Sequence, residues 1–151
     1  MLDIFTDGAS SGNPGPAGIG VVIKESGKVL LELSREIGQT TNNVAEYKAI
    51  IEALKEAGNL KANHIRVHTD SELLFNQIRG SFKVKSEDLK PLHDEVMVLA
   101  KSFGRVEMKR VPREENREAD LLAKGAIKHN ASQDGCPDVF VIGEESPSSR
   151  G

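Results

Sequence analysis

The sequence has a single cysteine, Cys136, in 151 residues. One cysteine excludes an internal disulfide and a zinc site made of several cysteines. No apolar run approaches the roughly 18–20 residues that a membrane-spanning helix requires. The first residues, MLDIFTDG, carry acids where a secretory signal needs basic residues and a long apolar stretch. We therefore expect a water-soluble, cytoplasmic protein with no membrane association.

Neither sign of charge is in large excess, because 20 basic and 23 acidic side chains give a net charge of −3. The deficit is confined to residues 130–151, where four acids accompany one arginine. Residues 1–129 are neutral overall, but residues 75–113 hold nine basic and five acidic side chains. This segment predicts a local basic surface of the kind that nucleic acid requires.

The length and composition predict one domain followed by a tail. With 38% hydrophobic side chains in 151 residues, the chain is long enough to bury a single core. The predicted domain covers residues 1–129. Residues 130–151 are rich in Ser, Asp, Gly and Pro and predict a tail, in which the apolar residues 139–142 either dock on the domain or pair as an extra edge strand.

Short apolar runs alternate with helical periodicities along the predicted domain. Strands are expected over residues 2–6, 18–24, 28–35, 64–69 and 105–111, and helices over about 43–57, 71–79, 91–103 and 114–129. The first three strands follow one another through short turns and predict an antiparallel meander. Strands joined through a helix usually pair in parallel. The pattern therefore predicts an α/β fold with a five-stranded mixed sheet covered by helices.

Four acidic residues stand where this fold would bring them together. Asp7 and Asp70 follow the first and fourth strands, and the carboxyl ends of neighbouring parallel strands lie at the same sheet edge, where ligands commonly bind. Glu46 and Asp120 each lie on the helical stripe that is expected to face the sheet. All four carboxylates are therefore expected to point toward one site.

Each acid also has a purely structural explanation. Asp7-Gly8 is typical of a turn, and Asp120 can pair with Lys124 one helical turn later. Residues 43–46 and 69–72 both have the spacing of a capping box. Taken together, however, these explanations leave four acids that repel one another without a cation.

A gathering of carboxylate oxygens suits Mg²⁺ or Mn²⁺. Two such ions roughly 3.5–4 Å apart activate a water and stabilise a leaving oxygen in phosphodiester hydrolysis. Asp7, Glu46, Asp70 and Asp120 therefore predict a centre for two Mg²⁺ ions, with Mn²⁺ as a substitute. No further cofactor is required.

Four groups of residues carry a resemblance to a known family. They are TDGAS at 6–10 with GNPGP at 12–16, TNNVAE at 41–46, TDS at 69–71, and ENREADLLA at 115–123. In this order they closely resemble type 1 ribonuclease H, over about residues 1–129. The resemblance implies the ribonuclease H-like fold with the sheet order 3-2-1-4-5.

The resemblance also implies an activity, which is endonucleolytic cleavage of the RNA strand of RNA–DNA hybrids that leaves 5′-phosphate and 3′-hydroxyl ends. It implies that Asp7 bridges two metal ions and that Asp70 and Asp120 are further ligands. Glu46 would bind metal and also lie near a ribose 2′-hydroxyl. We expect a monomer whose partner is the RNA–DNA hybrid, with no obligate protein partner.

Short polar side chains and bare backbone occur next to these motifs. The 2′-hydroxyls that distinguish RNA from DNA lie in a shallow minor groove, within reach of such groups. The expected contacts are Ser10, Gly12, Asn13, Asn42 and Asn43, and the resemblance implies that Thr41 and Asn43 hold a phosphate of the DNA strand. The alternative is an ordinary turn followed by a helix cap.

The chain departs from the family in three places. Many members carry a mobile histidine before the last acid, whereas residues 111–116 read VPREEN, and Arg113 is expected to steer phosphate there as a permanent cation. Tryptophan is absent, so Phe82 is the candidate for stacking on the DNA strand, with burial in the core as the alternative. Some members have a basic protrusion, and the corresponding segment of this chain is too short to form it. Lys83 and Lys85 are expected to supply part of its charge.

Two other functions use the same residues. Another nuclease of this fold, such as an exonuclease or a reverse-transcriptase-type domain, would need the same acids, although a chain of 151 residues beginning at Met1 argues against the latter. A catalytically silent module that binds hybrids would be expected to have lost acids. All four acids are present, which favours the enzyme.

Overall fold

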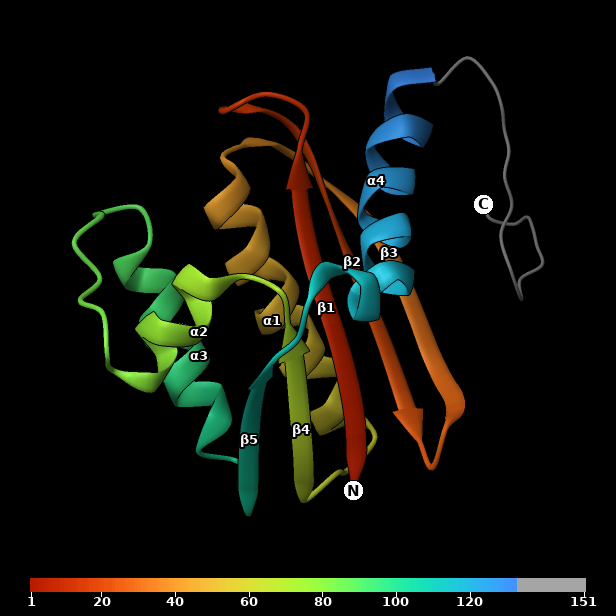
Figure 1. Cartoon of the computed structure of the whole chain (residues 1–151), viewed down its shortest axis with the longest axis vertical. Helices are drawn as coiled ribbons and strands as arrows, with labels where there is room; N and C mark the ends of the chain where they lie inside the picture. Colours follow the sequence, from red (N-terminus) through yellow and green to blue (C-terminus); the bar gives the residue numbers. More distant parts are fainter. Residues whose placement is uncertain (133–151) are drawn as a thin grey trace.

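Five strands form one mixed sheet in the order β3-β2-β1-β4-β5 (Figure 1). The computed structural model describes residues 1–132, so the strand expected at 139–142 lies outside the described residues. The strands are β1 (Leu2–Ser10), β2 (Gly15–Glu25), β3 (Lys28–Thr40), β4 (His64–Thr69) and β5 (Arg105–Arg110). β1 is antiparallel to β2 and parallel to β4. The predicted fold class and sheet order are both confirmed.

The helices also occupy the predicted places. They are α1 (Asn42–Asn59), α2 (Glu72–Arg79), α3 (Lys90–Ala100) and α4 (Arg117–Ser132). The last predicted helix is divided, because its first residues form a short 3₁₀ helix, η1 (Arg113–Asn116). α4 continues beyond residue 129, where the predicted domain ends.

Three strands are longer than the apolar runs that predicted them: β1, β3, and β2, which begins at Gly15 and ends at Glu25. β1 continues through Asp7-Gly8 to Ser10 because these residues pair with β2, with Asp7 opposite Gly20. The expectation of a turn at Asp7-Gly8 is therefore wrong. β3 continues to Thr40, which pairs with Gly15. The polar ends of β1 and β3 are held by ladder hydrogen bonds to β2, and hydrophobic periodicity does not report such bonds.

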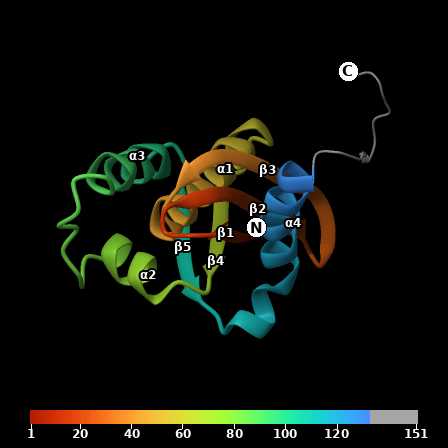
Figure 2. The ribbon, with the colours of Figure 1, turned by 90° about the horizontal axis from the view of Figure 1, so that it is seen from above.

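The sheet is covered by helices on both faces. Figure 2 shows α1, with α3 beside it, on one face and α4 on the other, where α4 contacts β1, β2 and β3. The main core lies under α1, where Ile4 and Val67 of the sheet pack with Tyr47 and Ile50. Burial of each such aliphatic side chain stabilises the fold by about 1.5–3 kcal/mol. This core sets the distance of α1 from the sheet.

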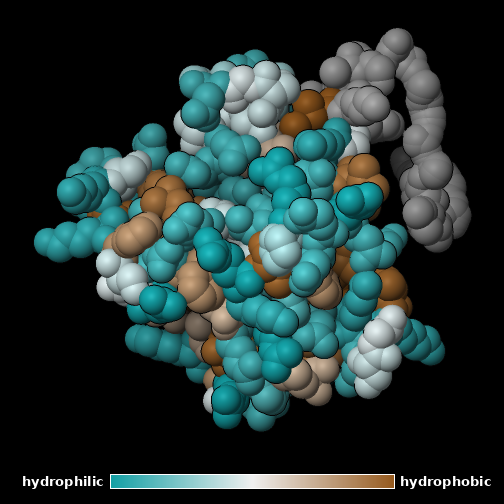
Figure 3. Space-filling view, in the orientation of Figure 1, coloured by the Kyte–Doolittle hydropathy of each residue, from teal (hydrophilic) through white to brown (hydrophobic). Residues whose placement is uncertain are grey.

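The face of the molecule in Figure 3 is mostly hydrophilic, with hydrophobic residues in small, separate groups. Isolated exposed apolar side chains are normal on a protein surface. None of the helices within residues 1–132 is long and apolar enough to span a membrane.

Candidate active site

Asp7, inside β1, and Asp70, the residue after β4, meet where the parallel pairing of these two strands ends. The parallel register of the two strands brings these residues level with each other. Asp7 is 5% exposed, and Asp70 is half-buried. Asp70 precedes α2, whose N-cap is Ser71, so the capping box expected for residues 69–72 does not form. The two carboxylates lie together, as the strand ends predict.

Glu46 reaches this place from the first turns of α1. Thr41 caps that helix, because its Oγ1 accepts a hydrogen bond from the N–H of Val44 at 3.3 Å. The Glu46 carboxylate is buried and accepts a hydrogen bond from the Gly8 N–H at 3.2 Å. A side chain at Gly8 would overlap with the α1 backbone. Glu46 therefore faces β1, and its explanation as part of a capping box is wrong.

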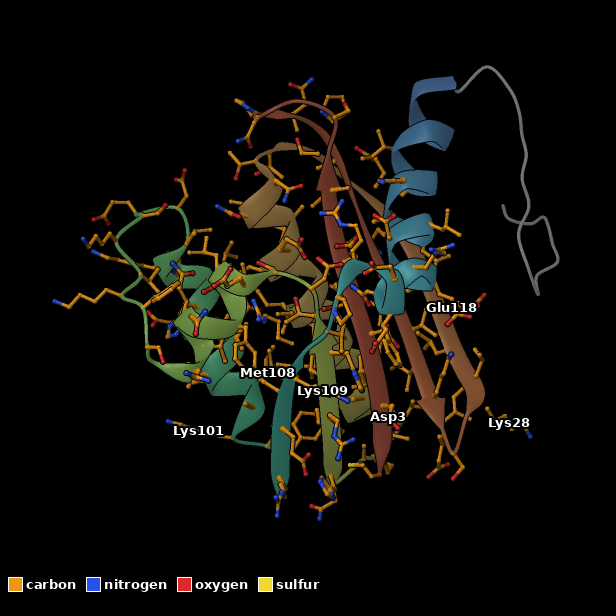
Figure 4. All side chains as sticks on the ribbon, viewed as in Figure 1. Asp3, Lys28, Lys101, Met108, Lys109 and Glu118 are labelled. Atoms are coloured by element: carbon orange, nitrogen blue, oxygen red, sulfur yellow. The ribbon has the colours of Figure 1, made fainter. Side chains whose placement is uncertain are left out.

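Asp120 reaches the same place from the first turn of α4. Gly20 lies opposite Asp7 in the β1–β2 ladder, and a side chain at Gly20 would overlap with the α4 backbone. Glu118, labelled in Figure 4, forms an ion pair of 2.8 Å with Lys24 of β2 and holds the same turn of α4 on the sheet. The close approach of α4 brings Asp120 beside Asp7, and the four carboxylates form one acid cluster (Asp7, Glu46, Asp70 and Asp120).

Asp120 also forms the ion pair that its spacing predicts. The Lys124 Nζ lies 3.3 Å from the Asp120 Oδ2. The Asp120 carboxyl nevertheless lies close enough to Asp7 to contribute to the raised pKa of Asp7. The ion pair with Lys124 is therefore compatible with a place for Asp120 in the acid cluster.

Burial and mutual repulsion raise the pKa of two carboxyls in the acid cluster. Burial is the largest cause that raises the pKa of Asp7 to about 10, and Glu46, Asp120 and Asp70 raise it further. Burial, followed by the charge of Asp70, raises the pKa of Glu46 to about 8. The positive charge of Arg113 opposes the shift at Glu46. Without a cation, the cluster is therefore partly protonated at neutral pH.

The geometry of the cluster fits a divalent metal ion. One carboxylate oxygen from each of Asp7, Glu46 and Asp70 lies within 4.8 Å of the others. Oxygens bound at about 2.1 Å to one octahedral Mg²⁺ lie about 3–4 Å apart, so small side-chain movements would bring these three onto one ion. A cation would also remove the repulsion that raises the two pKa values.

The predicted substrate-contact residues lie in two segments that meet. The Asn13 Oδ1 accepts a hydrogen bond from the Asn42 N–H at 3.1 Å, which joins the β1–β2 loop to the start of α1. Ser10 donates to the Thr40 carbonyl at 2.9 Å and contacts the carbonyl of Gly12. Thr41 and Asn43 lie in or beside the first turn of α1. Of the predicted contacts, Gly12, Asn13, Asn42 and Asn43 are exposed.

Similar solved structures share this fold and much of this sequence. The N-terminal RNase H domain of Rv2228c from Mycobacterium tuberculosis is 43% identical with a TM-score of 0.81, covering 83% of this chain and 98% of that chain. An RNase H1 named LC11, isolated from compost and solved in complex with an RNA/DNA hybrid, is 40% identical with a TM-score of 0.84. That match covers 87% of this chain and 100% of the other. A family model described as reverse transcriptase-like matches residues 5–126. The chain belongs to the ribonuclease H family.

This ribonuclease H domain also resembles a longer curated protein. The bifunctional protein Rv2228c of Mycobacterium tuberculosis is 41% identical over 153 residues, which cover 98% of this chain. The chain spans 42% of the length of that relative. The region matched by the family model contains all four members of the acid cluster.

Two of the departures noted in the sequence have clear positions in this ribonuclease H domain. Arg113 begins η1, is exposed, and lies close enough to Glu46 for its charge to lower the Glu46 pKa. Phe82 is 46% exposed, so the alternative interpretation, that it is a buried core residue, is wrong. It lies with Lys83 in a groove between α2 and α3.

One residue next to the acid cluster was not among the expected site residues. Asn116, at the end of η1, is buried and donates a hydrogen bond to the Asp70 carboxylate at 3.1 Å. The signal for it was its place in the ENREAD motif, four residues before Asp120. Sequence reasoning did not assign it a role because its partner lies 46 positions away.

Proposed function

We propose that this ribonuclease H domain is a metal-dependent endoribonuclease that hydrolyses the RNA strand of RNA–DNA hybrids and leaves 5′-phosphate and 3′-hydroxyl ends. The observation that carries the proposal is the convergence of three buried or half-buried carboxylates, whose oxygens lie within 4.8 Å of one another. The RNase H1 solved with an RNA/DNA hybrid, which aligns with 87% of this chain, supports the choice of substrate.

The four acids would hold two Mg²⁺ ions, with Mn²⁺ as a substitute. When bound, the ions supply an activated water and stabilise the leaving 3′ oxygen. Asp7, which has the other three acids near it, would be the central ligand, and Asp70 and Asp120 would be further ligands. The Gly8 N–H holds one oxygen of Glu46 and so orients its carboxylate toward the site.

Substrate discrimination is assigned to the loop after β1 and the start of α1. Ser10, Gly12, Asn13, Asn42 and Asn43 present small polar groups and backbone that can reach the 2′-hydroxyls of RNA. Thr41 and Asn43 would hold a phosphate of the DNA strand. Because Asn13 is hydrogen-bonded to the Asn42 backbone, the two segments would bind as one surface.

Cationic and aromatic groups would hold the rest of the hybrid. Arg113 would steer a phosphate at the acid cluster with a charge that does not titrate. Phe82 would stack on the DNA strand, and Lys83 and Lys85 would bind its backbone. We also propose that the chain acts as a cytoplasmic monomer, with residues 1–129 as its catalytic unit and residues 130–151 as a tail.

The proposal is tested by cleavage of an end-labelled RNA–DNA hybrid beside single-stranded RNA, duplex RNA and duplex DNA. Each substrate is incubated with Mg²⁺, Mn²⁺ or a chelator. We expect metal-dependent internal cuts in the RNA strand of the hybrid alone, lost in Asp70→Asn. Glu25→Gln, an equal change of charge at an exposed residue beside the hairpin between β2 and β3, should cut normally. Binding of the hybrid without cutting in either metal would instead indicate a silent binding module.

A further inference from the structure

Asn116 is a buried amide that joins three parts of the fold. It is 1% exposed, and its Nδ2 donates hydrogen bonds to the Thr6 carbonyl at 2.7 Å and to the Asp70 Oδ2 at 3.1 Å. An amide nitrogen carries two hydrogens, and these two bonds use both. Asn116 therefore links β1, the end of β4 and the segment that leads into α4.

The cost of burying Asn116 suggests a purpose beyond packing. Within residues 1–132, its Oδ1 has no hydrogen-bond partner although it is buried. An unpaired buried acceptor destabilises a fold, and a leucine, which has the same branching and number of side-chain heavy atoms, has no such acceptor. What leucine lacks is a donor for Asp70 and for the Thr6 carbonyl.

The backbone on both sides of Asp70 is held by hydrogen bonds, so only the side chain of Asp70 remains to be oriented. The backbone before it is held by the hydrogen bond from the Val111 N–H to the Thr69 carbonyl, at 2.9 Å. The backbone after it is held by the Ser71 N–H, which donates to the Thr69 Oγ1 at 3.1 Å. Asn116 then holds one carboxylate oxygen of Asp70, as the Gly8 N–H holds one oxygen of Glu46.

We propose that Asn116 is a positioning residue that orients the Asp70 carboxylate for the divalent cation. Through the Thr6 carbonyl, it ties that orientation to β1, the strand that carries Asp7. Residues that orient metal ligands by hydrogen bonds typically change metal affinity by about 10–100-fold when they are replaced. This positioning role rests on the proposed function only for the cleavage kinetics, because Mg²⁺ binding is measured without a hybrid.

The test compares Asn116→Leu with Gln77→Leu in the full chain. Gln77 is also a buried amide, but it accepts a hydrogen bond from the Tyr47 hydroxyl and is not bonded to the acid cluster. Calorimetric titration with Mg²⁺ alone should show about tenfold or greater weakening for Asn116→Leu and less than twofold change for Gln77→Leu. Asn116→Ser keeps one O–H donor and is measured if the leucine variant does not fold. It should weaken Mg²⁺ binding, but by less than the tenfold expected for Asn116→Leu.

Kinetics at saturating hybrid separate positioning from general damage. For Asn116→Leu we expect a lower kcat that recovers as Mg²⁺ is raised, with an unchanged KM for the hybrid. Equal loss of Mg²⁺ affinity in Asn116→Leu and Gln77→Leu, or Mg²⁺ affinity within twofold of wild type in both Asn116 variants, would overturn the proposal. A wild-type protein that binds Mg²⁺ more tightly than Asn116→Leu but cuts no hybrid would support the positioning role and refute the proposed function.

Discussion

At the scale of single residues, the acid cluster places two carboxyls where they resist ionisation. Burial is the largest cause that raises the pKa of Asp7 to about 10 and of Glu46 to about 8. A cation site needs its negative groups close together. Their mutual repulsion lowers the stability of the fold while no cation is bound. Stability and function are therefore expected to oppose each other at these positions.

Without divalent cations, the protein should become less stable as pH rises from 7 to 9. In the unfolded chain Asp7 and Glu46 ionise near their ordinary pKa values of 3.8 and 4.5, whereas in the fold they ionise near 10 and 8. The folded state therefore binds more protons over this range, and the free energy of unfolding should fall by about 4 kcal/mol, with Asp7 the larger contributor. Urea denaturation in chelator measures the change.

Two controls isolate the cause of this pH dependence. Asp7→Asn should flatten it, and saturating Mg²⁺ should also flatten it by replacing the protons. His68, whose pKa is lowered by burial, contributes little above pH 7 because its charged form is lost in both states. Equal pH dependence in Asp7→Asn and wild type would contradict the assignment to the acid cluster.

If the proposed function holds, Arg113→Ala should lower turnover of the hybrid by about tenfold or more, because it removes a charge that would face developing negative charge on the phosphate. The same change should raise the pKa of Glu46, since Arg113 lowers it in the intact protein. Arg113→Lys keeps the charge and should retain more activity. Steady-state rates for the three proteins measure the effect, and an unchanged rate in Arg113→Ala would exclude a role for this residue.

At the scale of elements, two glycines set how closely the helices approach the sheet. Gly8 admits the start of α1, and Gly20 admits the first turn of α4 on the opposite face. Because Asp7 lies next to Gly8 in β1 and opposite Gly20 in β2, both helices deliver their acids to it. The β1–β2 ladder thus determines where the acid cluster forms.

Gly20→Ala should displace α4 and separate Asp120 from Asp7. The added methyl group would overlap with the α4 backbone and lie 2.8 Å from the Ala123 nitrogen, which is expected to cost about 1–3 kcal/mol of stability. Mg²⁺ affinity should fall in the same variant. Thermal unfolding and calorimetric titration measure the two effects.

Gly58→Ala is the matched control for Gly20→Ala. Gly58 lies near the end of α1, and an added methyl group would have nothing within 4 Å. It should raise stability by about 0.5–1 kcal/mol, since alanine favours a helix over glycine. Mg²⁺ affinity that stays unchanged in Gly20→Ala would show that the approach of α4 does not position Asp120.

At the scale of the whole molecule, charge is distributed unevenly while the total stays near neutral. The excess of basic residues over 75–113 lies in α2, α3, β5, η1 and their connections, on the side of the sheet that adjoins the acid cluster through α2 and η1. The hairpin between β2 and β3, which carries Lys28, lies at the opposite end of the sheet (Figure 4). A hybrid is therefore expected to meet the basic segment rather than this hairpin.

Affinity for the hybrid should fall steeply with salt, and lysines of the basic segment should account for part of the slope. In an Asp70→Asn background, which prevents cutting, Lys83→Ala and Lys85→Ala should each reduce the slope of log affinity against log salt by about 1. Lys28→Ala should leave it unchanged. Fluorescence anisotropy over a salt series measures the slopes, and equal slopes for all three variants would exclude a specific basic contact.

The sequence alone determined the kind and order of the main elements and named the four acids of the acid cluster. β4 has the bounds that its apolar run predicts, and the stripe containing Tyr47 and Ile50 forms the buried face of α1. These signals are local, because side chains within a few residues determine which face of a strand or helix is buried. The family motifs then placed Asp7, Glu46, Asp70 and Asp120 in order.

Only the tertiary structure decided how these acids are held. The pairing of Asp7 with Gly20, the bond from the Gly8 N–H to Glu46 and the bond from Asn116 to Thr6, across 110 positions, each join residues far apart in the chain. The exposure of Phe82, which lies in the connection between α2 and α3, was likewise not determined by the local sequence. A local pattern reports which face of a segment is apolar, whereas a hydrogen bond or close contact between distant segments exists only once the whole chain has folded.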